Sequence, residues 1–167
     1  MASEFSYRLE PLLEQKEEIK KDAERDLGEA QKELESQQAT LRSLQQALQA
    51  LVEKRQQMRR ELLSKPADGV ALNAMKVQER VEYARAVALQ IEDAQGDVNA
   101  QRSVVDQCET RVQQAKKQVQ AATREVEILQ KHRAKQEERF VRELREKEEL
   151  ELDEIGNVLY MTRRRSS

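Results

Sequence analysis

The chain has 167 residues, of which 37% are charged and 3% aromatic, with no tryptophan and a formal net charge of −2. So few large side chains cannot fill the core of an ordinary globular domain, whereas this composition is typical of long helices and coiled coils. The small net charge also argues against a general nucleic-acid-binding protein, which needs a basic face. We therefore expect an extended all-α protein.

Disorder is the main alternative for so charged a chain, but the apolar residues here recur with a regular period. The first ten residues contain no apolar segment typical of a secretory signal, and no run approaches the ~18 apolar residues of a membrane span. Cys108 is the only cysteine, so an internal disulfide is impossible. We expect a cytoplasmic protein in which this cysteine is a small buried apolar residue.

A first long helix is predicted over about residues 10–63. Phe5, Tyr7 and Leu9 lead into it, and Pro11 follows, which suits the first turn of a helix. From Leu9 onward, a seam that steps by four and three residues carries apolar side chains at twelve of its sixteen positions. A period of 3.5 residues held over this length is typical of a left-handed coiled coil.

A bend is predicted at residues 64–70. Pro66 lacks the backbone donor that a helix interior needs, and the Asp68-Gly69 pair is typical of a turn. Because a helical pattern lies on both sides, the bend predicts two antiparallel helices that form a single coiled-coil hairpin over residues 1–167. The bend end is basic, since residues 41–65 hold six basic and two acidic side chains.

The second helix is predicted over about residues 71–159. Its seam runs from Val77 to Leu129, and over residues 98–126 valine alternates with a small residue or with Gln101. This gives a narrow seam that suits a partner carrying leucines, as the first helix does, because large side chains that face small ones interlock. After Leu129 the seam becomes polar at Arg133 and Gln136.

The second helix is expected to overhang the first. If the bend is centred near residue 67, the numbers of facing residues add to about 134, so Leu9 faces about residue 125 and ~45 Å of the second helix has no partner. This overhang is predicted to be a solvated single helix or a contact surface, because it carries an exposed apolar stripe. The stripe contains Phe140, Val141, Leu144, Leu152, Ile155, Val158 and Leu159. Gly156-Asn157 is expected to loosen or end the helix, and residues 160–167 to form a tail.

No catalytic motif is visible. The chain has no glycine-rich phosphate loop. His132 is its only histidine, so we exclude a histidine-rich metal site and a Ser/His/Asp catalytic triad. Carboxylates on a two-helix rod lack a cleft that would shift their pKa values. The basic side chains Arg55, Arg59, Arg60 and Lys65 lack an aromatic platform for bases. We therefore expect no enzyme, cofactor, metal or nucleic acid, and a solvated His132.

The two ends of the chain resemble the FliJ-type flagellar export proteins. Residues Phe5–Leu9 (FSYRL) open an acidic helix that continues as Leu13–Glu17 (LEQKE), and Glu127–Lys131 (EILQK) precedes Glu148–Ile155 (EELELDEI). Length, hairpin topology and the long second helix fit the family over the whole chain, and Leu152–Ile155 (LDEI) is its most specific motif. The resemblance implies a soluble part of the type III export apparatus, similar to the central stalk of rotary ATPases. Injectisome stalk proteins share this architecture.

The resemblance also implies the partners. It predicts binding to the hexameric export ATPase through the helix ends, to an inner-membrane export gate protein through the segment after the bend, and to export chaperones. It further predicts a cytoplasmic protein that is peripheral at the inner membrane. By position, the implied ATPase contacts are Phe5, Tyr7, Leu9, Phe140, Leu144, Leu152 and Ile155. The implied gate contacts are Met75, Val81 and Tyr83.

Two other functions fit a helical protein less well. A generic helical-hairpin holdase of the prefoldin type needs strand-forming segments at the bend, and Ser64–Asn73 is too short for a strand pair. A parallel structural homodimer would carry the break at Pro66–Gly69 in the middle of its rod.

Overall fold

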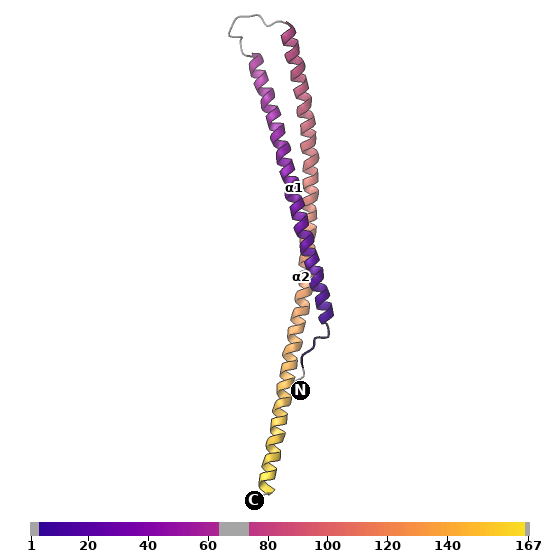
Figure 1. Cartoon of the computed structure of the whole chain (residues 1–167), viewed down its shortest axis with the longest axis vertical. Coiled ribbons are helices and arrows are strands. Elements are labelled where there is room, and N and C mark those ends of the chain that lie inside the picture. The colour runs from indigo at the N-terminus through magenta and orange to yellow at the C-terminus, as the bar shows by residue number, and fades with distance from the viewer. Residues whose placement is uncertain (1–3, 64–73, 166–167) are drawn as a thin grey trace. The chain divides into compact units, whose positions relative to one another are not determined.

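The computed structural model describes residues 4–63 and 74–165. Within them the chain forms two helices, α1 over Glu10–Leu63 and α2 over Ala74–Arg165 (Figure 1). These described residues contain no strand, and the two helices pack against each other, which confirms the predicted all-α class. The predicted bend at residues 64–70 and the expected start of the second helix at residue 71 lie outside the described residues.

The helices contribute to two units. Unit 1 comprises residues 1–25 and 117–167, and unit 2 comprises residues 26–116. In each unit a segment of α1 lies antiparallel to a segment of α2, because residue numbers rise along one helix as those of their partners fall along the other. Unit 1 contains the candidate ATPase contacts, and unit 2 contains the candidate gate contacts.

Helix α1 begins at Glu10 because the preceding residues supply its first acceptors. The Leu9 carbonyl accepts the first helical bond from the Leu13 N–H at 3.0 Å, and the Tyr7 carbonyl accepts from the Glu10 N–H at 3.0 Å. Pro11 lies in the first turn, where an N–H would have no partner within the helix. The negative charge of Glu10 also suits the positive end of the helix dipole.

Helix α2 ends later than the sequence predicts. Instead of ending near residue 159, it continues through Gly156-Asn157 to Arg165. A single glycine costs a helix only about 1 kcal/mol relative to alanine, and no proline follows this one. The arginines at 163–165 favour the negative end of the helix dipole. Residues 160–165 are therefore helical rather than part of a tail.

The core of unit 2 is the narrow seam of α2. Val87 and Val98 are each 1% exposed, and Val105, Val112 and Ala115 are also buried. Every residue of α2 that is buried in the structure occupies a position of the predicted seam. On α1, five seam leucines of this unit are half-buried; they are Leu34, Leu41, Leu44, Leu48 and Leu51. Small side chains on one helix thus lie beneath larger ones on the other.

One polar layer interrupts this seam. The Gln101 side-chain amide donates to Gln37 Oε1 at 2.7 Å and to the Gln37 carbonyl at 3.1 Å. The numbers 37 and 101 add to 138, rather than the expected 134, so the facing positions are displaced by four residues. The expected sum of 134 assumes that the two helices pair symmetrically about the centre of the proline–glycine break, and the observed sum of 138 shows that they do not. A paired polar group in a seam fixes the register at a cost in stability, and the two glutamines supply it here.

We expect the double variant Gln37→Leu/Gln101→Val to be at least as stable as the wild type, because matched apolar groups can replace a half-buried polar pair in the seam without loss. The single variant Gln101→Val should lose about 1–2 kcal/mol of stability, since Gln37 Oε1 then lacks the donor that it has across the seam. Urea denaturation followed by circular dichroism measures both. A single variant as stable as the double variant would show that the glutamine pair does not hold the register.

Candidate functional site

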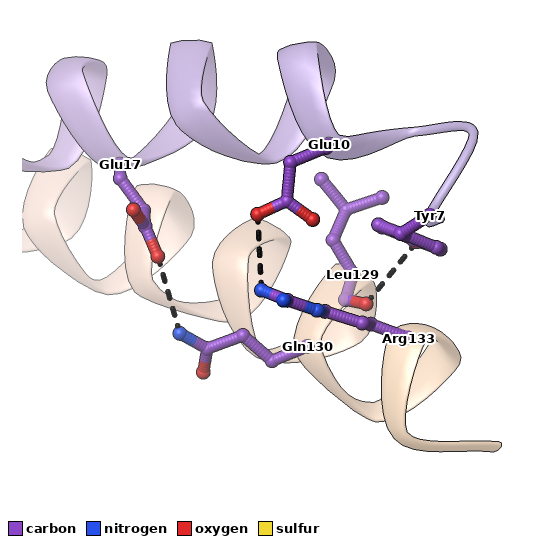
Figure 2. Close-up of polar contacts among 6 residues, drawn as sticks. All are labelled: Tyr7, Glu10, Glu17, Leu129, Gln130 and Arg133. Atoms are coloured by element: carbon purple, nitrogen blue, oxygen red, sulfur yellow. Dashed lines mark hydrogen bonds and ion pairs between the residues drawn. The ribbon is translucent and has the colours of Figure 1, made fainter. Parts of the chain in front are cut away.

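The first candidate surface lies in unit 1, where the residues before α1 contact α2. Tyr7 is buried there at 8% exposure. Its hydroxyl oxygen lies 2.8 Å from His132 Nδ1 and 3.3 Å from the carbonyl oxygen of Leu129. The hydroxyl donates to that carbonyl when Nδ1 carries a proton, and it can donate to Nδ1 in the other tautomer. Figure 2 shows Tyr7 lying over α2 next to Leu129.

Two ring contacts extend this arrangement. The Phe5 and Phe140 rings are 5.6 Å apart at 51°, and the Tyr7 and His132 rings are 5.6 Å apart at 49°. Both distances lie in the range of favourable aromatic pairs. We call Phe5, Tyr7, His132 and Phe140 the N-terminal cluster. The sequence predicts a solvated His132, and the residue is exposed, yet its ring also contacts Tyr7 in this cluster.

Charged side chains set the register beside the cluster. Arg133 Nη1 donates to Glu10 Oε1 at 3.0 Å, and Lys16 Nζ lies 2.6 Å from Glu125 (Figure 2 shows the first pair). These pairs add to 143 and 141, so α1 reaches further along α2 than the expected sum of 134 places it. Arg133 therefore has a partner on α1, although the expected register ends α1 opposite about residue 125. Exposed ion pairs contribute little stability, so we assign these a role in alignment.

Beyond Phe140, α2 presents an apolar face. At about 100° per residue, six of its large apolar side chains fall within an arc of about 120° on the helix surface, while Leu150, Tyr160 and Met161 lie outside it. We call this face the C-terminal stripe; it comprises Val141, Leu144, Leu152, Ile155, Val158 and Leu159. Leu144 is half-buried, while Leu152 and Ile155 are 67% and 57% exposed. Glu148 lies within the same arc. Exposed apolar side chains that share one helix face are typical of a contact surface.

The seven predicted ATPase contacts therefore separate into groups. Phe5 and Phe140 contact each other, and Leu9, which is 36% exposed, lines a cavity together with Tyr7 and His132. Tyr7 is buried within the cluster. The other three, Leu144, Leu152 and Ile155, belong to the C-terminal stripe. The sequence did not indicate the contact of Tyr7 with His132, because the residues before α1 have no periodicity that would place them.

The predicted gate contacts lie at the start of α2 in unit 2. Met75, Val81 and Tyr83 are 69%, 41% and 49% exposed. Helical spacing puts them on different sides of α2, so they do not form one face. Lys54 Nζ lies 5.2 Å from the centre of the Tyr83 ring, a cation–π contact. Tyr83 also lines a small cavity of about 120 Å³ together with Met58, Glu61, Leu62 and Arg80.

The described residues offer no group of three or more His, Cys, Asp or Glu side chains placed to hold a metal ion. No helix among residues 4–63 and 74–165 is both long and apolar enough to span a bilayer. The pKa of Lys21 is raised by its hydrogen bond to Glu18, 2.6 Å away. This is an exposed pair within one helix rather than a group poised for catalysis.

We expect Tyr7→Ala to loosen the start of α1, because it removes the buried ring and its contacts with His132 and Leu129. Amide hydrogen exchange over residues 9–20 should become at least tenfold faster, as expected for about 1.4 kcal/mol of lost local stability. Tyr160→Ala is the matched control, since Tyr160 is 67% exposed. Unchanged exchange in Tyr7→Ala would show that the cluster does not secure this end of α1.

Comparison with known proteins finds one matching family and one similar solved structure. Residues 4–166 match the model of the YscO-like family. Among solved structures, the chain is similar to CT670 from Chlamydia trachomatis, described as a YscO homolog. The TM-score is 0.80 and the identity 24%, and the match covers 98% of this chain and 100% of that one. At this identity the likeness shows the fold. No curated protein matches the chain.

Proposed function

The chain belongs to the YscO-like family, whose proteins are associated with type III secretion, and we propose that it is a non-catalytic stalk that binds the export ATPase ring. The observation that carries this proposal is the C-terminal stripe, an exposed apolar face on a single continuing helix. The family match supports the part of the FliJ-type resemblance that implies a type III secretion protein, and it does not extend to the FliJ type itself. Because the matching family is YscO-like, we propose an injectisome rather than a flagellar apparatus.

The length of α2 supports binding inside a ring. From Val141 to Arg165 it has 25 residues, which corresponds to ~37 Å of helix. A single helix is only ~10–12 Å wide with its side chains, so it fits a narrow opening. We propose that Leu144, Leu152 and Ile155 contact the ATPase directly. Phe5, Leu9 and Phe140 contact it at the rim, and Tyr7 acts by holding the N-terminal cluster together.

The other proposed partner is the inner-membrane export gate protein, which would hold the chain at the membrane from the cytoplasmic side. Since Met75, Val81 and Tyr83 face different directions, they cannot all enter one groove. Tyr83 is the best supported of the three, because it combines an exposed ring with a cavity beside it. We propose that export chaperones bind the C-terminal stripe when the ATPase does not occupy it.

Binding to the hexameric export ATPase should depend on the stripe. Leu152→Glu/Ile155→Glu should weaken binding at least tenfold, a loss of about 1.4 kcal/mol, because it places charge in the centre of an apolar contact. Leu150→Glu/Met161→Glu is the matched control, since Leu150 and Met161 are 64% and 66% exposed but lie off the stripe. Isothermal titration against the assembled hexamer measures both variants.

The two double variants carry the same added charge, so equal losses in both would contradict a specific contact. A chain that ends at Phe140 provides a second check. It keeps the Phe5–Phe140 contact and the whole seam, so it should stay helical by circular dichroism while it loses ATPase binding. If this shortened chain bound the hexamer as well as the full chain does, the stripe would not be the binding surface.

The gate contact should be separable from the ATPase contact. We expect Tyr83→Ala to weaken binding to the cytosolic domain of the gate protein about tenfold and to leave ATPase binding within about twofold of the wild type, as for loss of a single aromatic anchor. Leu89→Ala is the control on the same helix, because Leu89 is 63% exposed and lies away from the cavity. Surface plasmon resonance with each partner measures the difference, and unchanged gate binding in Tyr83→Ala would rule this residue out.

A further inference from the structure

Exposed apolar side chains gather at one end of unit 2, at the end of α1 and the start of α2. We call residues 53–63 and 74–85 the basic tip. It exposes six large apolar side chains: Leu62, Leu63, Met75, Val77, Val81 and Tyr83. In the rest of unit 2, the described residues expose two others, Leu89 and Val104. Apolar exposure is therefore concentrated at this end.

Positive charge is concentrated at the same end. The basic tip holds seven Lys or Arg and four Glu residues, a net charge of +3. The other described residues of unit 2, 26–52 and 86–116, hold five basic and nine acidic side chains, a net charge of −4. The reversal of sign along the same two helices coincides with the start of the apolar exposure.

On α2 these side chains surround the helix rather than sharing a face. Met75, Val77, Val81 and Tyr83 are spread around α2 by its rotation of about 100° per residue. A protein groove recognises a helix by one face, whereas a lipid interface can surround the end of a rod from all sides. Long basic side chains can also keep their charges among headgroups while apolar neighbours enter the interface.

We propose that the basic tip binds an anionic lipid surface directly. Lysines and arginines near a membrane are attracted by its negative potential, and exposed aliphatic side chains insert between headgroups. An acidic protein would satisfy the charges but would leave apolar side chains on the remaining sides of both helices exposed. This contact does not depend on the ATPase or gate binding proposed above, since it needs lipid alone.

Sedimentation of the full chain with vesicles tests the proposal. We expect binding to vesicles that contain about one-third phosphatidylglycerol in phosphatidylcholine, and at least tenfold weaker binding to phosphatidylcholine alone. Raising the salt concentration should weaken the anionic binding because it screens the surface potential. Absence of binding to anionic vesicles, or equal binding to both kinds, would overturn the proposal.

Charge reversal locates the contact. Arg59→Glu/Arg60→Glu/Lys76→Glu should reduce binding to anionic vesicles at least tenfold. The matched control Arg139→Glu/Arg145→Glu/Lys147→Glu changes the net charge equally in unit 1, and it should stay within about twofold of the wild type. Arg59→Gln/Arg60→Gln serves as a milder tip variant should the triple reversal lower the helicity. Equal losses of vesicle binding in the tip and control variants would show that binding depends on net charge alone, which contradicts a contact at the basic tip. A tip variant that loses gate binding but keeps vesicle binding would make this end a protein surface instead.

Apolar insertion has its own test. Leu63→Ser/Val81→Ser keeps every charge of the basic tip and removes two exposed aliphatic side chains. We expect it to reduce vesicle binding about tenfold at high salt, where the electrostatic attraction is screened. Leu89→Ser/Val104→Ser is the control within unit 2. Unchanged binding in the tip variant would show that headgroup charge is recognised without insertion, which contradicts the proposed mode.

Discussion

The structure depends on the small side chains in the seam of α2, against which α1 packs. Valine and alanine occupy most of its buried positions, and two of the valines, Val87 and Val98, are almost completely enclosed. Only a second helix can bury such short side chains this well, because no other element lies beside them in the described residues. In unit 2, the leucines of α1 from Leu34 to Leu51 then cover the seam while remaining half-exposed themselves. A two-helix protein gains its apolar burial along a line, so each interruption of that line affects the register of everything beyond it.

The glutamine layer and the N-terminal cluster control that register at different places. Gln37 and Gln101 align the helices within unit 2, where their side chains form a hydrogen bond across the seam. In unit 1, Tyr7, Glu10 and Lys16 contact α2 through polar groups. Sliding either pairing by one heptad would separate these donors from their acceptors. Polar contacts thus select one alignment among several that the apolar seam alone would tolerate.

Periodicity in the sequence was sufficient to predict most of the fold. It placed every buried residue of α2 on the seam, because a 3.5-residue repeat has direct geometric meaning. It could not supply the alignment of the helices, since that depends on which glutamine pairs with which and not on the repeat. It also could not place Tyr7 or His132, because one lies before the first helix and the other at a polar position of the second. The sequence also predicts too early an end for α2, because Gly156 resembles a helix end although a single glycine breaks a helix only weakly.

The C-terminal stripe has a different pitch from the seam it continues. The six residues of the stripe stay within one arc of about 120° over residues 141–159, which corresponds to the 3.6-residue period of a straight helix. The seam before it repeats every 3.5 residues, the period of a left-handed supercoil, whereas a stripe with a period near 3.6 stays on one side of a straight helix. A third helix that followed the path of α1 would drift off the stripe. α2 is therefore one continuous helix with two apolar faces of different period, and a surface that accepts its end need not accept its paired part.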